Sequence, residues 1–348
     1  MGNETKLRLN YIDCLRGFTI FLVVLGHMMR GVYNAGIQSY YFKYIDAIIY
    51  SFHMPLMFFI SGYVNSFSKK SVSLRISIIN SILQLYVPYI FFSYALWFIK
   101  YFIFSGNTSE ELKTVFKIPY IGYDLYWFLM ALIAIKIVKI LWSGLREKIK
   151  YMNSDIIETI FWFTLSFIVF YLLNQDLYIN SFFIWISWGL IYHLGELFGK
   201  YKLFEIIKYK NLCIISLICI VIGIVSSHRI IFDLRVIWLS YSKFFIGIGS
   251  SILLFLIFKI CNVNNRFLIY LGKYSMVIYL LHYPINGMIR TGLIKLGIIN
   301  FSLLSLIGTF LGVLISLLLF EVIKSIHILS WIQYLFYPLK YKKILNRM

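Results

Sequence analysis

Three polar residues lie on one face of the first apolar helix that the sequence predicts. The stretch Tyr11–His27 reads YIDCLRGFTIFLVVLGH and carries Asp13, Arg16 and His27 among apolar residues. Arg16 and His27 are 11 residues apart, which leaves them roughly 20° from the same helical face and about 16 Å apart along the axis. Because an ionisable ring is costly to bury in hydrocarbon, His27 is a candidate catalytic residue.

A neutral imidazole buried at this depth is suited to act as a general base. Asp13 lies within about 60° of both Arg16 and His27 on the helical wheel, and we expect it to pair with Arg16. All three residues are therefore catalytic candidates. The alternative role for His27 is structural, as a hydrogen-bond partner of a neighbouring membrane helix.

The second apolar segment carries a second histidine, His53, at a similar depth. Asp46 precedes His53 by seven residues and falls about 20° from the same face. Pro55 removes one helical hydrogen bond and bends or opens the helix there. We expect His53 to meet His27 in one cavity and to assist it, with Asp46 as a substrate-binding candidate. A kinked packing helix with a satisfied histidine is the alternative.

Further candidates lie near the ends of later segments. His282 shares a face with Ser275 and stands four residues before Asn286, so these three side chains lie along one side of a helix. Asp124 and Trp127 open the fourth segment, where an aromatic face can stack on a sugar ring. We predict that His282, Asp124 and Trp127 contact the substrate; helix packing and an interfacial aromatic belt are the alternatives.

Composition identifies the elements that position these residues as membrane helices. The chain is 61% hydrophobic and 14% charged, whereas soluble domains carry about 25% charged residues. Mean hydropathy is +0.82. Apolar runs of about 20 residues recur along the whole chain, as bilayer-spanning helices require. We predict an all-α polytopic bundle of ten helices, at 12–30, 44–64, 78–104, 123–142, 155–174, 181–199, 211–228, 236–258, 274–291 and 300–322.

Charge distribution predicts the orientation of this bundle. With the N-terminus inside, the inner segments hold 20 lysines and arginines and the outer segments hold nine. The positive-inside rule then places both termini in the cytoplasm. The net charge of +19 is thus explained by topology and by attraction to membrane lipids, not by nucleic acid. The basic segment 323–348 is expected to lie along the inner surface.

The sequence lacks the motifs of several other enzyme classes. It contains no phosphate-binding P-loop, no dinucleotide-binding glycine fingerprint, no HExxH and no GxSxG. The four cysteines show no zinc-ligand spacing, so we expect no metal. Few acidic residues lie within the apolar segments, which argues against a proton-coupled transporter.

Four stretches together resemble the acyltransferase-3 family of integral membrane acyltransferases, in particular the branch of fucose 4-O-acetylases and the enterobacterial common antigen O-acetyltransferase. They are YIDCLRGFTIFLVVLGH (11–27), FHMPLMFFISGY (52–63), YWFLMALI (126–133) and LGKYSMVIYLLHYP (271–284). The resemblance extends over essentially the whole chain and implies a single membrane acyltransferase domain, 1–348.

The resemblance implies transfer of an acetyl group from cytosolic acetyl-CoA to a hydroxyl of a surface glycan or its lipid-linked precursor. It assigns essential roles to Arg16 and His27, and coenzyme binding to Arg16 with basic residues of an inner loop, here Lys69, Lys70 and Arg75. The arginine-rich run that the family often has before its VPY element is replaced here by SILQL (81–85). The implied location is the inner (plasma) membrane of a bacterium.

Two other functions remain open at this stage. One is transfer of succinyl or another acyl group by the same fold. The other is transport or flipping of a lipid-linked saccharide, with the histidines lining the pathway. A transporter would move the saccharide without any dependence on acetyl-CoA, and the mass gained by the glycan distinguishes acetyl from succinyl transfer.

Overall fold

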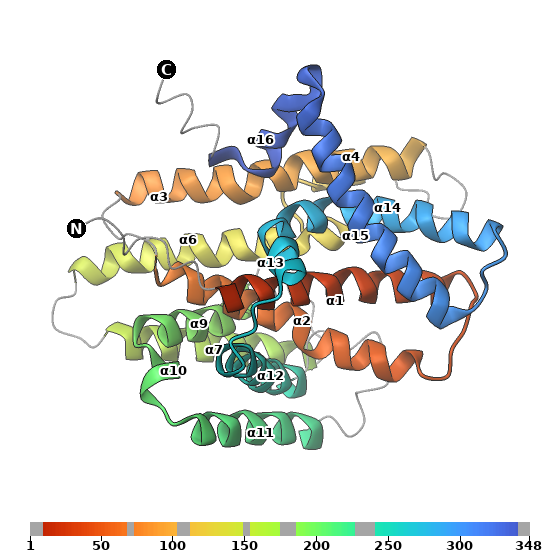
Figure 1. The fold of residues 1–348 in the computed structure, drawn as a ribbon. Coiled ribbons are helices and arrows are strands. Elements are labelled where there is room, and N and C mark those ends of the chain that lie inside the picture. Colours follow the sequence, from red (N-terminus) through yellow and green to blue (C-terminus); the bar gives the residue numbers. More distant parts are fainter. Residues whose placement is uncertain are drawn as a thin grey trace. The chain divides into compact units, whose positions relative to one another are not determined.

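The computed structural model describes residues 10–67, 73–102, 112–148, 154–174, 186–226 and 241–339. The described residues form helices joined by turns and contain no β-strand (Figure 1). They divide into two compact units, Met1–Tyr63 with Leu197–Leu317, and Val64–Glu196 with Leu318–Met348. The prediction of an all-α membrane bundle is confirmed, whereas the single domain 1–348 stays a prediction.

In the described part of the first unit, eight helices lie wholly or mainly within its bounds, one of them the short α10. They are α1 (Asn10–Asn34), α2 (Phe42–Asn65), α10 (Leu203–Ile206), α11 (Tyr209–Ser226), α12 (Tyr241–Ile260), α13 (Arg266–Lys273), α14 (Ser275–Lys295) and α15 (Phe301–Ser325). Both α2 and α15 continue past the boundary of this unit.

The second unit holds the remaining elements, several of them short. They are α3 (Leu74–Ser81), the π-helix η2 (Ile82–Tyr86), α4 (Val87–Phe102), α5 (Thr114–Lys117), η3 (Asp124–Tyr126), α6 (Trp127–Lys148), α7 (Ser154–Asn174), most of α9 (Gly189–Lys200), η4 (His327–Ile332) and α16 (Gln333–Phe336).

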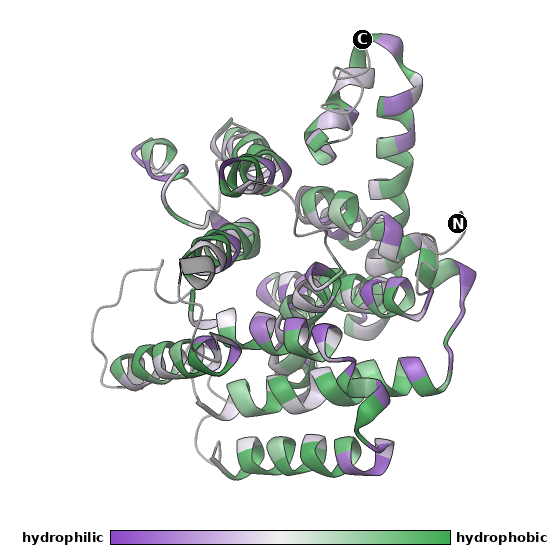
Figure 2. Ribbon diagram, turned by 90° about the vertical axis from the view of Figure 1, so that its left-hand side faces the viewer, coloured by the Kyte–Doolittle hydropathy of each residue, from purple (hydrophilic) through white to green (hydrophobic). Residues whose placement is uncertain are grey.

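Among the described residues, five helical stretches are long and apolar enough to cross a membrane. They are Asn10–Asn34, Phe42–Asn65, Leu74–Phe102, Asp124–Leu145 and Phe301–Ser325. Shorter apolar helices lie at Tyr209–Val225 and Phe244–Ile260. Hydrophobic residues dominate the helices, and hydrophilic residues gather towards helix ends and turns (Figure 2). The chain is thus a multi-pass helical membrane protein, while ten crossings and inward termini stay predictions.

The structure changes the predicted elements in two places, and another predicted helix lies partly outside the described residues. In place of the expected helix 78–104, the helices α3, η2 and α4 follow one another without a break. The π-helix η2 ends at Tyr86, two residues before Pro88. The sixth expected helix, 181–199, is described only from residue 186. The expected loop 259–273 contains α13, because the Asn265 side chain accepts a hydrogen bond from the Leu268 amide at 3.1 Å and so caps a new helix.

Close packing of α1 within the first unit fixes the elements that carry the candidate residues. α1 packs chiefly against α13, then α14 and α12. At its N-terminal half, a Cβ atom on Gly17 or Gly272 would collide with the backbone of the facing helix. Only glycine therefore permits this approach of α1 to α13. At its C-terminal half, an apolar cluster that includes Met28, Tyr50 and Leu293 joins α1, α2 and α14.

The second unit is organised around a buried charge network. Lys139 on α6 pairs with Glu158 of α7 and Glu196 of α9. The His193 ring lies between them, with Nδ1 2.9 Å from the Lys139 ammonium and Nε2 3.0 Å from the Thr159 hydroxyl. Removing one member of such a network would leave an unpaired charge, so these contacts connect α6, α7 and α9.

Candidate active site

His27 lies in the C-terminal half of α1, where its half-buried ring faces α2. Its Nδ1 atom is 3.0 Å from the hydroxyl oxygen of Tyr50. The two rings meet edge to face, with centroids 5.9 Å apart. This single hydrogen bond fixes the ring orientation and leaves Nε2 as the nitrogen that can face a substrate.

Tyr50 is itself held by an ion pair that links α1 to α2. The Arg30 guanidinium carbon lies 3.2 Å from the centroid of the Tyr50 ring, a cation–π contact. Arg30 also donates to both oxygens of Asp46, at 2.7 and 2.8 Å, and Asp46 is fully buried. A bidentate pair is the strong form of such contacts. Asp46 therefore orients Arg30, Arg30 covers Tyr50, and Tyr50 positions His27.

His282 on α14 supplies a second imidazole beside His27. The ring centroids are 5.4 Å apart and the rings are inclined by 33°. Nδ1 of His282 lies 3.0 and 2.9 Å from the carbonyl oxygens of Ile278 and Tyr279, so Nδ1 carries the proton that it donates. The neutral ring then presents a lone pair at Nε2. This atom is buried and has no hydrogen-bond partner among the described residues.

His53 lies one aromatic ring away from His27. Its ring is 4.6 Å from that of Tyr50, edge to face, and its Nδ1 lies 2.7 Å from the Ile49 carbonyl oxygen. The histidine rings of the first two spans therefore both adjoin Tyr50, and their predicted shared cavity stays a prediction. The imidazole in direct ring contact with His27 is that of His282.

Asp13 and Arg16 occupy the opposite end of α1, beside α13. Their charged atoms are 3.8 Å apart, so the predicted pair is present. Asp13 is buried, and 28% of the Arg16 side chain remains exposed to solvent. A partly exposed guanidinium is suited to meet an anionic ligand at this end of the helix.

The remaining predicted residues lie in the second unit or outside the described residues. Asp124 and Trp127 begin η3 and α6 of the second unit, where Lys100 forms an ion pair with Asp124. Arg75 is exposed on α3 of the same unit. Lys69 and Lys70 lie outside the described residues. Their predicted roles in substrate and coenzyme binding stay predictions.

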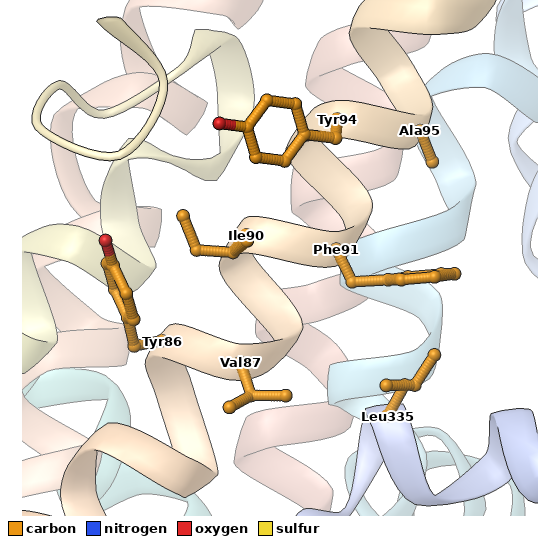
Figure 3. A pocket seen from close by; sticks show the side chains of 7 residues that line it. All are labelled: Tyr86, Val87, Ile90, Phe91, Tyr94, Ala95 and Leu335. Atoms are coloured by element: carbon orange, nitrogen blue, oxygen red, sulfur yellow. The ribbon is translucent and has the colours of Figure 1, made fainter. Parts of the chain in front are cut away.

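A groove of about 540 Å³ lies in the second unit, along one face of α4. Figure 3 shows the side chains of Ile90 and Tyr94 on α4 and of Tyr86 at the end of η2, with Leu335 of α16 near Phe91. The lining is apolar except for the two tyrosine hydroxyl groups and offers no base or cation. Acyl-transfer chemistry is therefore better supported at the histidine group of α1, α2 and α14.

Two residues that complete this site, Arg30 and Tyr50, were not among the predicted ones. The signal was present in the spacing, because Arg30 is three residues after His27, and Tyr50 is four after Asp46 and three before His53. What the spacing leaves undetermined is the rotation of α1 against α2. Within the part of the chain that the structure describes, no three His, Cys, Asp or Glu side chains are placed to hold a metal ion.

Comparisons with known proteins agree with the resemblance in the sequence. The acyltransferase domain of the acyltransferase-3 type matches residues 9–321. The chain is 34% identical over 125 residues to nodulation protein NolL of Sinorhizobium fredii (strain NBRC 101917 / NGR234). It is 27% identical over 151 residues to the protein of that name from Mesorhizobium japonicum (strain LMG 29417 / CECT 9101 / MAFF 303099).

These two alignments take in 35% and 43% of this chain, but only 33% and 40% of the respective relatives. The chain thus spans between a third and two fifths of the length of the curated relatives it matches. No solved structure matches it. The match over 9–321 includes α1, α2 and α14, which carry the histidine group. This chain belongs to the acyltransferase-3 family and is a multi-pass membrane protein.

Proposed function

We propose that this protein transfers an acetyl group from cytosolic acetyl-CoA to a hydroxyl of a surface polysaccharide or of its lipid-linked precursor. The observation that carries the proposal is the pair of adjoining imidazoles, His27 and His282, inside helices that the family match covers. Both face the interior of the first unit, and a hydrogen bond to a second group orients each ring.

His27 acts as the general base in this proposal. The acceptor hydroxyl oxygen attacks the thioester carbonyl carbon while its proton passes to Nε2 of His27. The C–S bond then breaks, and the coenzyme thiolate takes the proton back from His27. This role requires the tautomer in which Nδ1–H donates to the Tyr50 oxygen. A positioned base of this kind contributes roughly 10²- to 10⁴-fold to the rate.

His282 binds the acceptor rather than removing its proton. Its Nε2 lone pair is buried, and the two carbonyl contacts of Nδ1 fix the tautomer of the neutral ring. A buried acceptor without a donor is costly, and a second hydroxyl of the sugar would supply that donor. The two histidines thus have separate roles in the mechanism.

The coenzyme enters from the cytoplasm at the Arg16 end of α1. Arg16 offsets phosphate charge there. Lys69, Lys70 and Arg75 stay coenzyme-binding candidates from the sequence alone. The extended arm then carries the thioester along α1 towards His27, a distance of about 16 Å by helical rise. We place the protein in the inner (plasma) membrane of a bacterium.

Transfer of label from acetyl-CoA to a cell-envelope saccharide fraction tests the proposal. His282→Phe should raise the KM for the acceptor and largely preserve kcat, and His282→Gln should restore acceptor binding because its side-chain oxygen can accept the same hydrogen bond. If His282→Phe instead abolishes kcat with KM unchanged, the roles assigned to the two histidines are wrong.

The mass gained by the product identifies the acyl group. An acetyl increment supports the proposal, and a succinyl increment replaces the donor while leaving the enzyme class unchanged. Saccharide movement across the membrane without acetyl-CoA would contradict the assignment as a transferase.

A further inference from the structure

A guanidinium from α14 occupies the face of α1 that carries His27. Gly31 follows His27 by four residues, so it lies on the same face, one helical turn further on. A Cβ atom at Gly31 would collide with Nη1 of Arg290. The Arg290 side chain therefore fills the space that any larger residue at position 31 would take.

In the described part of the first unit, Arg290 has no acidic partner. Three acidic residues lie there, and each is paired with another cation. Asp46 is bound by Arg30 through both oxygens, Asp13 lies 3.8 Å from Arg16, and Glu205 lies 3.6 Å from Lys259. Arg290 is half-buried. A partly desolvated guanidinium without a counter-charge is unfavourable, and a bound anion would offset that cost.

We propose that Arg290 binds an anionic group of the acceptor, a phosphate or a carboxylate, held against the bare backbone at Gly31. This inference rests on the proposed function, because it places the anion beside the reacting hydroxyl at His27. The planar guanidinium fork suits either oxyanion. The acceptor is then an acidic saccharide or one joined to phosphate, and a neutral glycan is the poorer substrate.

The position of Arg290 indicates how far the anion lies from the reacting hydroxyl. Four residues of helix between His27 and Gly31 correspond to about 6 Å along the axis. That separation is about the length of one sugar ring, so the charge belongs to the acylated sugar or to its immediate neighbour. Arg16 lies on the other side of His27 along α1, and the coenzyme phosphates are therefore separate from this anion site.

Steady-state kinetics of the full-length protein in nanodiscs of neutral phosphatidylcholine test the inference. The substrates are labelled acetyl-CoA and a cell-envelope saccharide fraction, and pyrophosphate and glucuronate serve as anionic probes. Loss of one charge-assisted contact in Arg290→Gln should raise the KM for the acceptor about 10- to 100-fold, with the KM for acetyl-CoA unchanged. At least one probe should compete with the acceptor in the wild type and lose that competition in Arg290→Gln.

Two further variants keep the charge and disturb only its geometry. Arg290→Lys retains one cation without the fork, and Gly31→Ala displaces the flexible end of the arginine side chain, so both should raise the acceptor KM by an intermediate factor. Lys295→Gln is the matched control, because it removes an exposed cation from the end of the same helix. It should leave both KM values unchanged.

An unchanged acceptor KM in Arg290→Gln would overturn the inference, as would failure of both probes to compete with the acceptor. An effect that appears only when the nanodiscs contain phosphatidylglycerol would assign Arg290 to a lipid headgroup and also overturn it. Failure of the proposed function is recognised separately, by transfer that survives in His27→Ala.

Discussion

Replacing Tyr50 by Phe tests the hydrogen bond that orients His27. The variant removes one hydroxyl group and retains the ring, which lies under the Arg30 guanidinium and against His53. The bond lost is the 3.0 Å contact between the Tyr50 oxygen and Nδ1 of His27. A neutral hydrogen bond contributes about 0.5–1.5 kcal/mol net, and loss of that amount in the transition state lowers kcat about 2- to 10-fold.

The assay is steady-state acetyl transfer by purified protein, normalised to the folded fraction. Both KM values should stay within error, because Tyr50 acts through His27 and touches neither substrate in the proposed mechanism. Tyr33→Phe is the matched control. It removes a hydroxyl from α1 while leaving the stacked contact of that ring with Phe42, whose centroid is 4.3 Å away.

The reasoning is refuted if kcat of Tyr50→Phe equals that of the wild type and of Tyr33→Phe. A loss that follows only the amount of folded protein would also refute it, because it would assign Tyr50 to stability and not to the orientation of His27.

Two further predictions concern the buried charges. Asp46→Asn leaves Arg30 without its carboxylate partner. Because 26% of the Arg30 side chain is exposed, water offsets part of the lost interaction. We expect thermal unfolding to show about 1–3 kcal/mol of destabilisation, together with a reduced kcat. Lys139→Met strands one buried and one half-buried carboxylate in the second unit and should lower stability by about 3–5 kcal/mol. The double variant Lys139→Met, Glu158→Gln should regain part of that stability, and equal melting temperatures for the single and double variants would contradict the network described here.

Composition and hydrophobic runs were sufficient to predict the long apolar helices, but not the π-helix and the short helix that connect some of them. Apolar length alone places helices over α1, α2, α7 and α15 within a few residues. Length does not reveal that the third rod passes through a π-turn at Ile82–Tyr86. It also does not reveal α13, because that short helix depends on one cap at Asn265 and on contacts with α1.

The helices that carry the candidate site were predicted, but the contacts between their side chains were not. Helical spacing identifies His27, His53 and His282 as interior residues. The rotation of α1 against α2 and α14 decides which of them adjoin. Tertiary packing sets that rotation, through the Met28 side chain and through Gly26, where a Cβ atom would collide with the Tyr50 ring. The Asp13–Arg16 pair was predictable because the two residues lie three positions apart on one helix, where side chains are neighbours.

Removal of the His27 imidazole tests the central claim most directly. Labelled acetyl transfer from acetyl-CoA to the cell-envelope saccharide fraction is measured for His27→Ala, after its insertion and folded amount are shown to equal those of the wild type. The account predicts a fall of roughly 10²- to 10⁴-fold, the contribution of a positioned base. Transfer near the wild-type rate would contradict it.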